Sequence, residues 1–118
     1  MTNNKRLKEM FKLSSRITLY VPSTTDVDQE IDNSSYVDKA ARLFADLFGG
    51  STSTPALGYW VSANKGLIKE KTTLVFAYCS DKDLQEKVDK VIDYCIAMKV
   101  ELKQEAVSLE INGEMYFI

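Results

Sequence analysis

Few residues in this chain could do chemistry, because its 118 residues include no histidine. Metal sites built on imidazole, Ser-His-Asp and Cys-His nucleophiles, and proton transfer near neutral pH by an unperturbed side chain are therefore excluded within one chain. Of the two cysteines, Cys79 and Cys95, each lies in an apolar periodic segment. This placement predicts buried free thiols that behave as small hydrophobes, with a redox pair as the alternative.

The carboxylate that best fits a ligand-binding role is Glu70, which lies within a predicted strand. A hairpin with a two-residue loop at Asn64-Lys65 would place Glu70 opposite Tyr59. Desolvation between apolar neighbours would suit this carboxyl group to proton transfer, with Tyr59 as its hydrogen-bonding partner. The alternative is a strand-end glutamate that reaches solvent or pairs with a lysine. We predict Tyr59 and Glu70 as ligand-binding residues and assign no catalytic residue, metal or cofactor.

Two further patterns favour structural roles. The acidic segment 23–33 carries Asp26, Asp28, Glu30 and Asp32 but no glycine, so it does not match a calcium loop and is predicted to be a solvated loop. The pair Gly49-Gly50 follows a predicted helix C-terminus, whereas phosphate groups bind at helix N-termini. We therefore expect the glycines to end that helix.

The elements that must position these residues follow the order strand, helix, strand, strand, helix, strand. The predicted strands span 16–21, 56–62, 67–79 and 106–111, the predicted helices 35–48 and 80–104, and Asn112-Gly113 predicts a final hairpin to a strand at 114–118. This order predicts an α+β fold, a ferredoxin-like βαββαβ sandwich. Its sheet is mainly antiparallel with strand order 5-4-1-3-2, two helices on one face and an extra C-terminal hairpin strand. We expect residues 16–118 to form a single domain and residues 1–15 to form a tail or short helix.

The uncovered face of this sheet is the predicted interaction surface. It would carry Tyr20, Trp60, Lys69 and Lys71, and the apolar C-terminal edge would add Phe117. Aromatic side chains are enriched at protein interfaces, so we predict a homodimer or a protein partner. In the same register, the opposite face would pack on the core through Leu57, Tyr59, Val61, Ile68, Leu74, Phe76 and Tyr78, while Thr73, Val75 and Ala77 would share the open face.

The charge and hydropathy of the chain argue against two classes of partner, nucleic acids and membranes. With 15 Lys+Arg against 17 Asp+Glu the net charge is −2, so no long-range field attracts nucleic acid or an anionic membrane. Tyr20, Phe76 and Tyr78 partly match the base-stacking residues of RNA-recognition modules. The basic-Gly-aromatic opening is missing, however, and two of these rings are assigned to the core. No apolar run approaches the roughly 20 residues of a membrane span, and the first residues lack a signal-peptide pattern. We predict a cytoplasmic protein that binds neither nucleic acid nor membrane.

Several segments support a resemblance that covers nearly the whole chain: Ile17-Thr-Leu-Tyr-Val-Pro22, Phe48-Gly-Gly50, Ala56-Leu-Gly-Tyr-Trp-Val61, Leu67-Ile-Lys-Glu-Lys71 and Glu110-Ile-Asn-Gly-Glu-Met-Tyr-Phe-Ile118. The chain resembles small uncharacterised proteins of bacterial plasmids and conjugative elements. The resemblance implies a mobile-element setting, where accessory proteins bind host or replicon factors. We therefore predict a small, self-associating binding or regulatory module and favour binding over enzymatic activity. The alternative is a small-molecule enzyme or sensor with a pocket near Tyr59 and Glu70.

Overall fold

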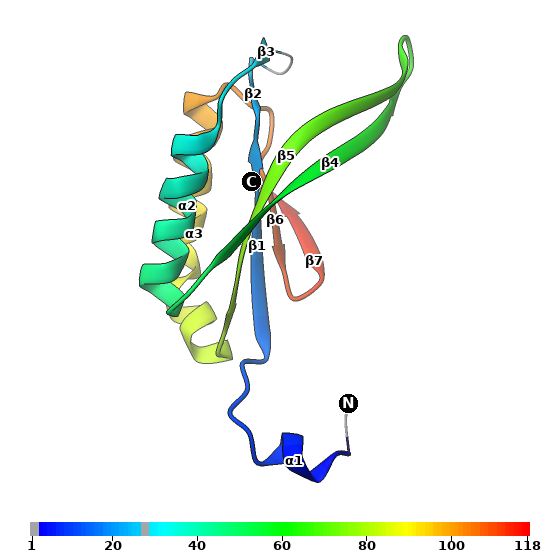
Figure 1. Ribbon diagram of the computed structural model, residues 1–118. Helices are drawn as coiled ribbons and strands as arrows, with labels where there is room; N and C mark the ends of the chain where they lie inside the picture. The colour runs from blue at the N-terminus through cyan, green and yellow to red at the C-terminus, as the bar shows by residue number, and fades with distance from the viewer. Residues whose placement is uncertain (1–2, 27–28) are drawn as a thin grey trace.

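The computed structural model describes residues 3–26 and 29–118, so Asp28 of the acidic segment lies outside the described residues. It is a mixed α+β fold with a five-stranded antiparallel sheet, in the order β4-β5-β1-β6-β7. The sheet comprises β1 (Ser15–Pro22), β4 (Thr52–Ser62), β5 (Gly66–Cys79), β6 (Ser108–Ile111) and β7 (Glu114–Phe117). Helices α2 (Ser34–Phe48) and α3 (Asp81–Glu101) lie on one face of the sheet (Figure 1).

The predicted α+β class and the mainly antiparallel sheet are confirmed, but the order of elements along the chain is richer than predicted. A four-residue helix, α1 (Lys5–Lys8), precedes the sheet, and a small two-stranded sheet, β2 (Thr24–Thr25) and β3 (Gln29–Glu30), interrupts the acidic segment. Among the described residues, no helix is long and apolar enough to cross a membrane.

Local signals explain where the two long helices begin and end. The hydroxyl of Ser80 accepts a hydrogen bond from the Asp83 amide at 3.1 Å, which caps the N-terminus of α3. At the end of α2, Gly49 adopts a left-handed conformation with φ 93°, which costs glycine little because it has no Cβ. The helix predicted to begin at residue 35 begins at Ser34, after Asn33, and the Asp32 carboxylate accepts from the Ser34 amide at 3.0 Å.

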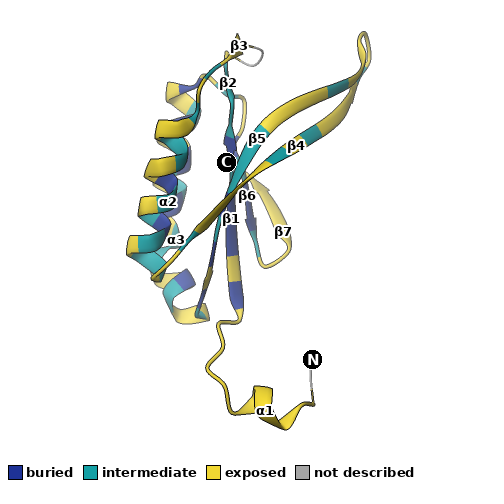
Figure 2. Cartoon of the chain, viewed as in Figure 1, coloured by how far each residue is buried: buried dark blue, intermediate teal, exposed yellow. Residues whose placement is uncertain are grey.

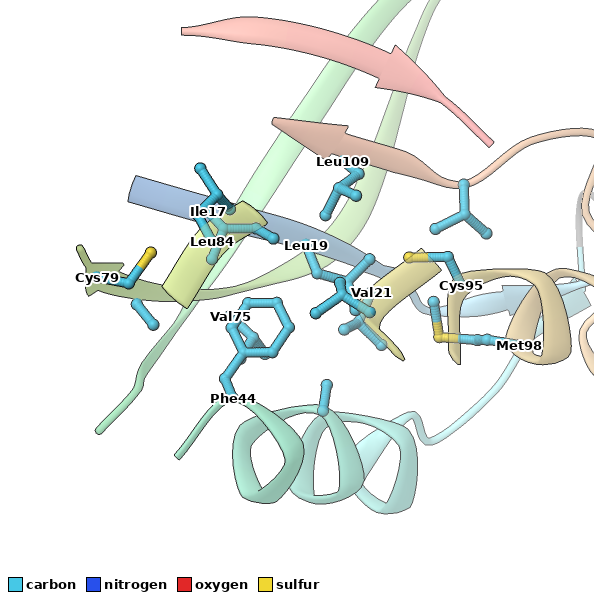
Figure 3. Close-up of a cluster of buried hydrophobic side chains, with 14 of the residues drawn as sticks. Ile17, Leu19, Val21, Phe44, Val75, Cys79, Leu84, Cys95, Met98 and Leu109 are labelled. Carbon is cyan, nitrogen blue, oxygen red and sulfur yellow. The ribbon is translucent and has the colours of Figure 1, made fainter. Parts of the chain in front are cut away.

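The core lies between the sheet and the two helices (Figure 3). Ile17, Leu19 and Val21 of β1 are fully buried, and Phe44 of α2 is buried against Val75 of β5. Cys79 and Cys95 are buried free thiols, as predicted, and they lie at opposite ends of this cluster. Burial raises the pKa of the Cys95 thiol to about 12, which removes it from nucleophilic chemistry at neutral pH.

The predicted register of the β4–β5 hairpin is wrong by one residue. A three-residue loop, 63–65, joins the strands, so Tyr59 lies opposite Lys69 and Glu70 lies opposite Gly58. Because side chains alternate along a strand, this slip places Tyr59 and Glu70 on opposite faces of the hairpin. Gly66, at φ 72°, adopts the left-handed conformation that closes such a loop.

The faces of the inner half of β5 are also the reverse of those predicted. Val75 and Ala77 are buried beneath the helices, whereas Phe76 and Tyr78 lie on the open face. Their rings form an edge-to-face pair with centroids 6.3 Å apart. Thr73 lies on the helix side together with Val75 and Ala77, because it pairs with the buried Val21. One argument against base stacking, the burial of Phe76 and Tyr78, therefore fails, while the missing sequence motif and the acidic composition still stand.

The outer half of the hairpin, residues 57–69, projects beyond the helices and is called the hairpin arm below (Figure 1). Its side chains are exposed on both faces (Figure 2): Tyr59 is 58%, Trp60 50% and Val61 77% exposed. Lys69 and Lys71 lie on the helix side of the ribbon rather than on the predicted open face. They still reach solvent because no helix extends far enough to cover them.

Candidate functional site

The open face of the sheet holds a cleft of about 220 Å³ where β1 ends, beside the outer part of β5 and the start of β6. We call it the Glu70 cleft. It is lined by side chains from separate elements: Tyr20 of β1, Glu70 and Thr72 of β5, Ser108 of β6, and Gln104 of the segment after α3, with the backbone of Gly58 on the fourth side.

Strand pairing places the first wall of the cleft. Glu70 lies directly opposite Gly58, and the next pair inward is Thr72 with Ala56, so the β4 side carries little side-chain volume. A larger residue at Gly58 would project beside the Glu70 carboxylate, because opposed residues of antiparallel strands point to the same face. Tyr20 enters from β1, where it pairs with Leu74 on the same face. The Glu70 side chain is therefore open to a ligand on one flank.

The opposite wall is held rigidly by hydrogen bonds at the end of α3. The Gln104 Nε2 atom donates to the carbonyl oxygens of Thr24 at 2.9 Å and Leu102 at 3.2 Å. The Leu102 carbonyl also accepts from the Asp26 amide at 3.0 Å and from the Thr25 hydroxyl at 3.2 Å. These bonds fix the small β2–β3 sheet to the helix terminus, so this wall is already formed without a ligand.

Hydrogen bonds also secure the floor of the cleft. The Thr72 hydroxyl donates to the Val21 carbonyl at 3.0 Å, and the Ser23 hydroxyl donates to the Lys71 carbonyl. The end of β1 is thereby tied to β5 next to Glu70. The Glu70 side chain itself is solvent-exposed, so the desolvation expected from the sequence does not occur. An exposed carboxylate of this kind is suited to attracting a cation.

The chemistry available in the cleft is that of hydroxyl and amide groups, a carboxylate and an aromatic ring, with Lys71 at the rim. Tyr20, Ser108 and Gln104 supply polar atoms around Glu70, and no thiol lies among the lining residues. Within residues 3–26 and 29–118, no group of three or more Cys, Asp or Glu residues could hold a metal ion. The arrangement can bind a ligand that combines positive charge with hydrogen-bond donors.

Of the residues predicted as functional, the structure brings only some together. Tyr20 and Glu70 share the cleft, and Trp60 lies on the same face two residue pairs further along the hairpin arm. Tyr59 and Lys69 lie on the other face of the arm, and Lys71 contributes to the cleft rim. Phe117, the remaining predicted interface residue, is 73% exposed on β7 at the far edge of the sheet and does not line the cleft.

Sequence reasoning missed Gln104, Thr72 and Ser108. No local pattern marks them, because each becomes a lining residue only through its contacts with a distant element. Ser108 does alternate with its apolar neighbours Val107 and Leu109, which predicts that it faces away from the core. Thr72 lies between Lys71 and Thr73 and carries no such signal.

A second polar cluster on the open face is structural. Arg16 and Glu110 form an ion pair at 3.0 Å, and the Glu110 carboxylate accepts from the Gly113 amide at 2.6 Å. Burial opposes the charged form of Glu110, but these hydrogen bonds outweigh it and hold the pKa of Glu110 below its ordinary value. Since the Asn112 side chain also accepts from the Arg16 amide at 2.8 Å, the cluster fastens the β6–β7 turn to β1.

No protein-family model matches this chain, and no curated protein matches it. Two solved structures are similar over nearly their whole length. A phage SAM lyase in complex with S-methyl-5′-thioadenosine has a TM-score of 0.63 at 16% identity, covering 92% of this chain and 94% of that chain. A phage SAM lyase in the apo state has a TM-score of 0.61 at 17% identity with the same coverage. At such low identity, the likeness shows a shared fold.

Proposed function

We propose that this chain is a small-molecule enzyme that binds S-adenosylmethionine at the Glu70 cleft and releases S-methyl-5′-thioadenosine. The observation that carries the proposal is the position of the Glu70 carboxylate, beside Tyr20, in a preformed cleft on the open face. The full-length fold likeness to a phage SAM lyase in complex with S-methyl-5′-thioadenosine supports the choice of ligand.

The charge of the ligand explains why these side chains suit it. S-adenosylmethionine carries a permanent sulfonium cation, which a carboxylate attracts and which an aromatic face also stabilises. Glu70 supplies the carboxylate, and Tyr20 with Trp60 supplies aromatic surface on the same face. The thioether product is neutral and loses this attraction, so binding would favour the substrate over the product.

The bond cleavage can be balanced without a protein base. The sulfonium carbon–sulfur bond breaks with its electron pair passing to sulfur, which gives the neutral thioether. The carbon that leaves sulfur forms a new bond to the carboxylate oxygen of the same fragment, so no water, proton acceptor or external nucleophile is consumed. This route suits a chain without histidine, whose cleft would act by holding the substrate in a reactive geometry.

Protein binding is the second candidate function, and the hairpin arm favours it. Tyr59, Trp60, Val61 and Leu67 are each at least half exposed on a ribbon of only two strands, which is marginally stable in water by itself. A second copy packed on the arm or on the open face would cover them.

The size of the Glu70 cleft also bears on the choice between the two functions. At about 220 Å³ it is smaller than the roughly 300–1,000 Å³ of most ligand sites, so part of a nucleoside ligand would lie outside it.

We also propose a ferredoxin-like fold and a mobile-element origin for this chain. The two-layer arrangement, with a strand order in which β1 lies between β5 and β6, supports a ferredoxin-like sandwich with β7 as an added edge strand. A cytoplasmic protein of a plasmid or conjugative element remains our interpretation of the sequence resemblance.

The test is calorimetric titration of S-adenosylmethionine and S-methyl-5′-thioadenosine into wild type and Glu70→Gln, with chromatography of the reaction mixture for the thioether product. We expect Glu70→Gln to weaken binding of the sulfonium about ten-fold and binding of the neutral thioether less than about two-fold. Glu114→Gln, an exposed carboxylate on β7, is the matched control and should leave both affinities unchanged. Equal losses for both ligands, or no binding by wild type, would overturn the proposal.

A further inference from the structure

The N-terminal segment, residues 3–14, differs in charge from the rest of the molecule. Its four cations, Lys5, Arg6, Lys8 and Lys12, stand against the single anion Glu9, giving a net charge of +3. Because the whole chain carries −2, the remainder carries −5. Basic segments are attracted to acidic surfaces over about 8 Å at physiological salt. The remainder of a second copy, with its net charge of −5, offers such an acidic partner.

The same segment is apolar as well as basic. Phe11 is 86% exposed, Met10 59%, Leu7 50% and Leu13 38%. The segment extends away from the N-terminal end of β1 and does not pack along the domain (Figure 1). Its helix, α1, spans four residues and is capped by the Asn4 side chain, which accepts from the Arg6 amide at 2.9 Å. So short a helix draws little stability from its own hydrogen bonds and depends on packing against a surface.

A suitable surface lies at the C-terminal end of α2. A groove of about 450 Å³ is lined by the aromatic side chains of Phe48, Phe76 and Tyr78 and by the small residues Gly49, Gly50 and Thr52. We call it the Phe48 groove. None of its lining residues is charged. The absence of a side chain at the two glycines leaves room for an aromatic ring between the helix end and the open face, and no atom lies within 4 Å of a Cβ placed at either one.

The electrostatics of the groove also favour the segment. The C-terminal end of a helix carries a partial negative charge that stabilises nearby cations. Helix α2 has no basic residue in its last turn, and the cation that reaches its end is Lys87, whose Nζ atom donates to the Leu47 carbonyl at 2.8 Å. A bound segment with Phe11 in the groove would bring Lys8 and Lys12 to this helix end.

Geometry favours a groove on another copy over the groove on the same chain. Leu13 already lines the groove of its own chain, and the residues before it lead away from the domain. Each copy then offers one segment and one groove, so two copies related by a two-fold axis would each fill the groove of the other. An anionic membrane or a nucleic acid would attract the segment but repel the domain, because the domain carries the larger, negative charge.

We propose that the N-terminal segment of one copy docks in the Phe48 groove of a second copy, with the Phe11 ring as its apolar anchor. This contact is independent of the Glu70 cleft. The contact covers the Phe11 ring of the segment and the aromatic side chains that line the groove. It also pairs the basic segment with an acidic domain.

Disulfide trapping tests the contact directly. Met10→Cys is made in one tagged chain and Thr52→Cys in a second, differently tagged chain, which leaves Phe11 in place. The native Cys79 and Cys95 are buried and do not compete. After mixing and mild oxidation, we expect a disulfide between the two tagged chains. Asn64→Cys, at the exposed tip of the hairpin arm, replaces Thr52→Cys as the control and should give at least about five-fold less product.

A second measurement examines the anchor. Light scattering across a wide concentration range should show wild type associating and Phe11→Ser dissociating at least about ten-fold more readily, because the Phe11 ring loses its burial. Phe11 lies outside the core, so the variant should fold and keep ligand binding at the Glu70 cleft. A further variant carries Met10→Cys and Thr52→Cys in one chain. Equal trapping at residues 52 and 64, a disulfide that forms only within single copies of this double variant, or a monomeric wild type would overturn the proposal.

Discussion

The β4–β5 hairpin contains two regions of similar composition and opposite environment. In the inner region, here called the sheet base, Val75, Ala77 and Cys79 of β5 are at most 3% exposed beneath the helices. In the hairpin arm, Tyr59, Val61 and Leu67 are at least 58% exposed. The side-chain types are alike, so the difference comes from how far the helices reach along the sheet. An apolar strand pattern therefore marks a surface that needs a neighbour, which the same chain provides for the base but not for the arm.

The largest expected effect comes from removing core volume between the sheet base and helix α2, which covers it. Phe44→Ala should lower the free energy of unfolding by about 3–5 kcal/mol, because the ring is fully buried and leaves a cavity. Val61→Ala in the arm should change it by less than about 0.5 kcal/mol. Denaturant unfolding monitored by circular dichroism measures both. A cost at Val61 comparable to that at Phe44 would mean that the arm is covered in solution and would break the comparison.

The two open-face carboxylates should also differ. Glu110→Gln should cost about 2 kcal/mol at neutral pH, because its carboxylate accepts from Gly113 and pairs with Arg16. The exposed Glu70 has no such role in holding the sheet together, and Glu70→Gln should leave stability within about 0.5 kcal/mol. Unfolding curves of the two variants at pH 7 measure the difference, and similar losses in both would contradict the structural role given to Glu110.

The cost of Glu110→Gln should depend on pH in a defined direction. The folded protein holds the pKa of Glu110 below its ordinary value, so the unfolded chain binds that proton more readily. The stabilisation is therefore fully present above the unfolded-state pKa of about 4.3 and is lost as the pH falls through the lowered folded value. Unfolding measured from pH 7 down to pH 2 should show wild type and variant converging. A gap that stays constant would count against the ion pair.

The smallest expected effect concerns two serines that bind backbone amides. Ser80→Ala at the base should cost about 1 kcal/mol, because its hydroxyl caps the 21-residue helix α3. Ser62→Ala in the arm removes longer contacts, at 3.3 Å, to the amides of Asn64 and Lys65. It should cost no more than a few tenths of a kcal/mol, since that turn is exposed. Thermal unfolding of both variants provides the test, and the reverse ranking would refute the assignment.

The positions of the main elements could be predicted because their signals are local. Ser80 and Gly49 mark helix ends through their own backbone bonding, and the Asn112-Gly113 pair marks a turn. The strand faces could not be predicted for β5, because Leu74, Phe76 and Tyr78 are as apolar as Val75, Ala77 and Cys79, so alternation gives no preference. The register depended on Gly66, whose left-handed backbone indicates a three-residue loop, but the two-residue loop was equally consistent with the hydrophobic pattern.

The candidate site was predicted only in part, for the same reason. Glu70 could be singled out as a carboxylate within a strand, and Tyr20 as an aromatic residue on the open face. Their meeting depends on how β1 pairs with β5, and Gln104 joins them only because the end of α3 is bonded to the β2–β3 segment. Glu70 was assigned to the core-facing side together with Tyr59, and the one-residue slip places it on the open face instead.

The central claim is that the Glu70 cleft holds a sulfonium nucleoside. Its most direct test is nuclear magnetic resonance of ¹⁵N-labelled protein titrated with S-adenosylmethionine. We predict saturable amide shifts at Glu70, Thr72 and Ser108, with the same shifts weakened about ten-fold in Glu70→Gln. Shifts confined to the hairpin arm or the helices, or no shifts at millimolar ligand, would contradict the claim.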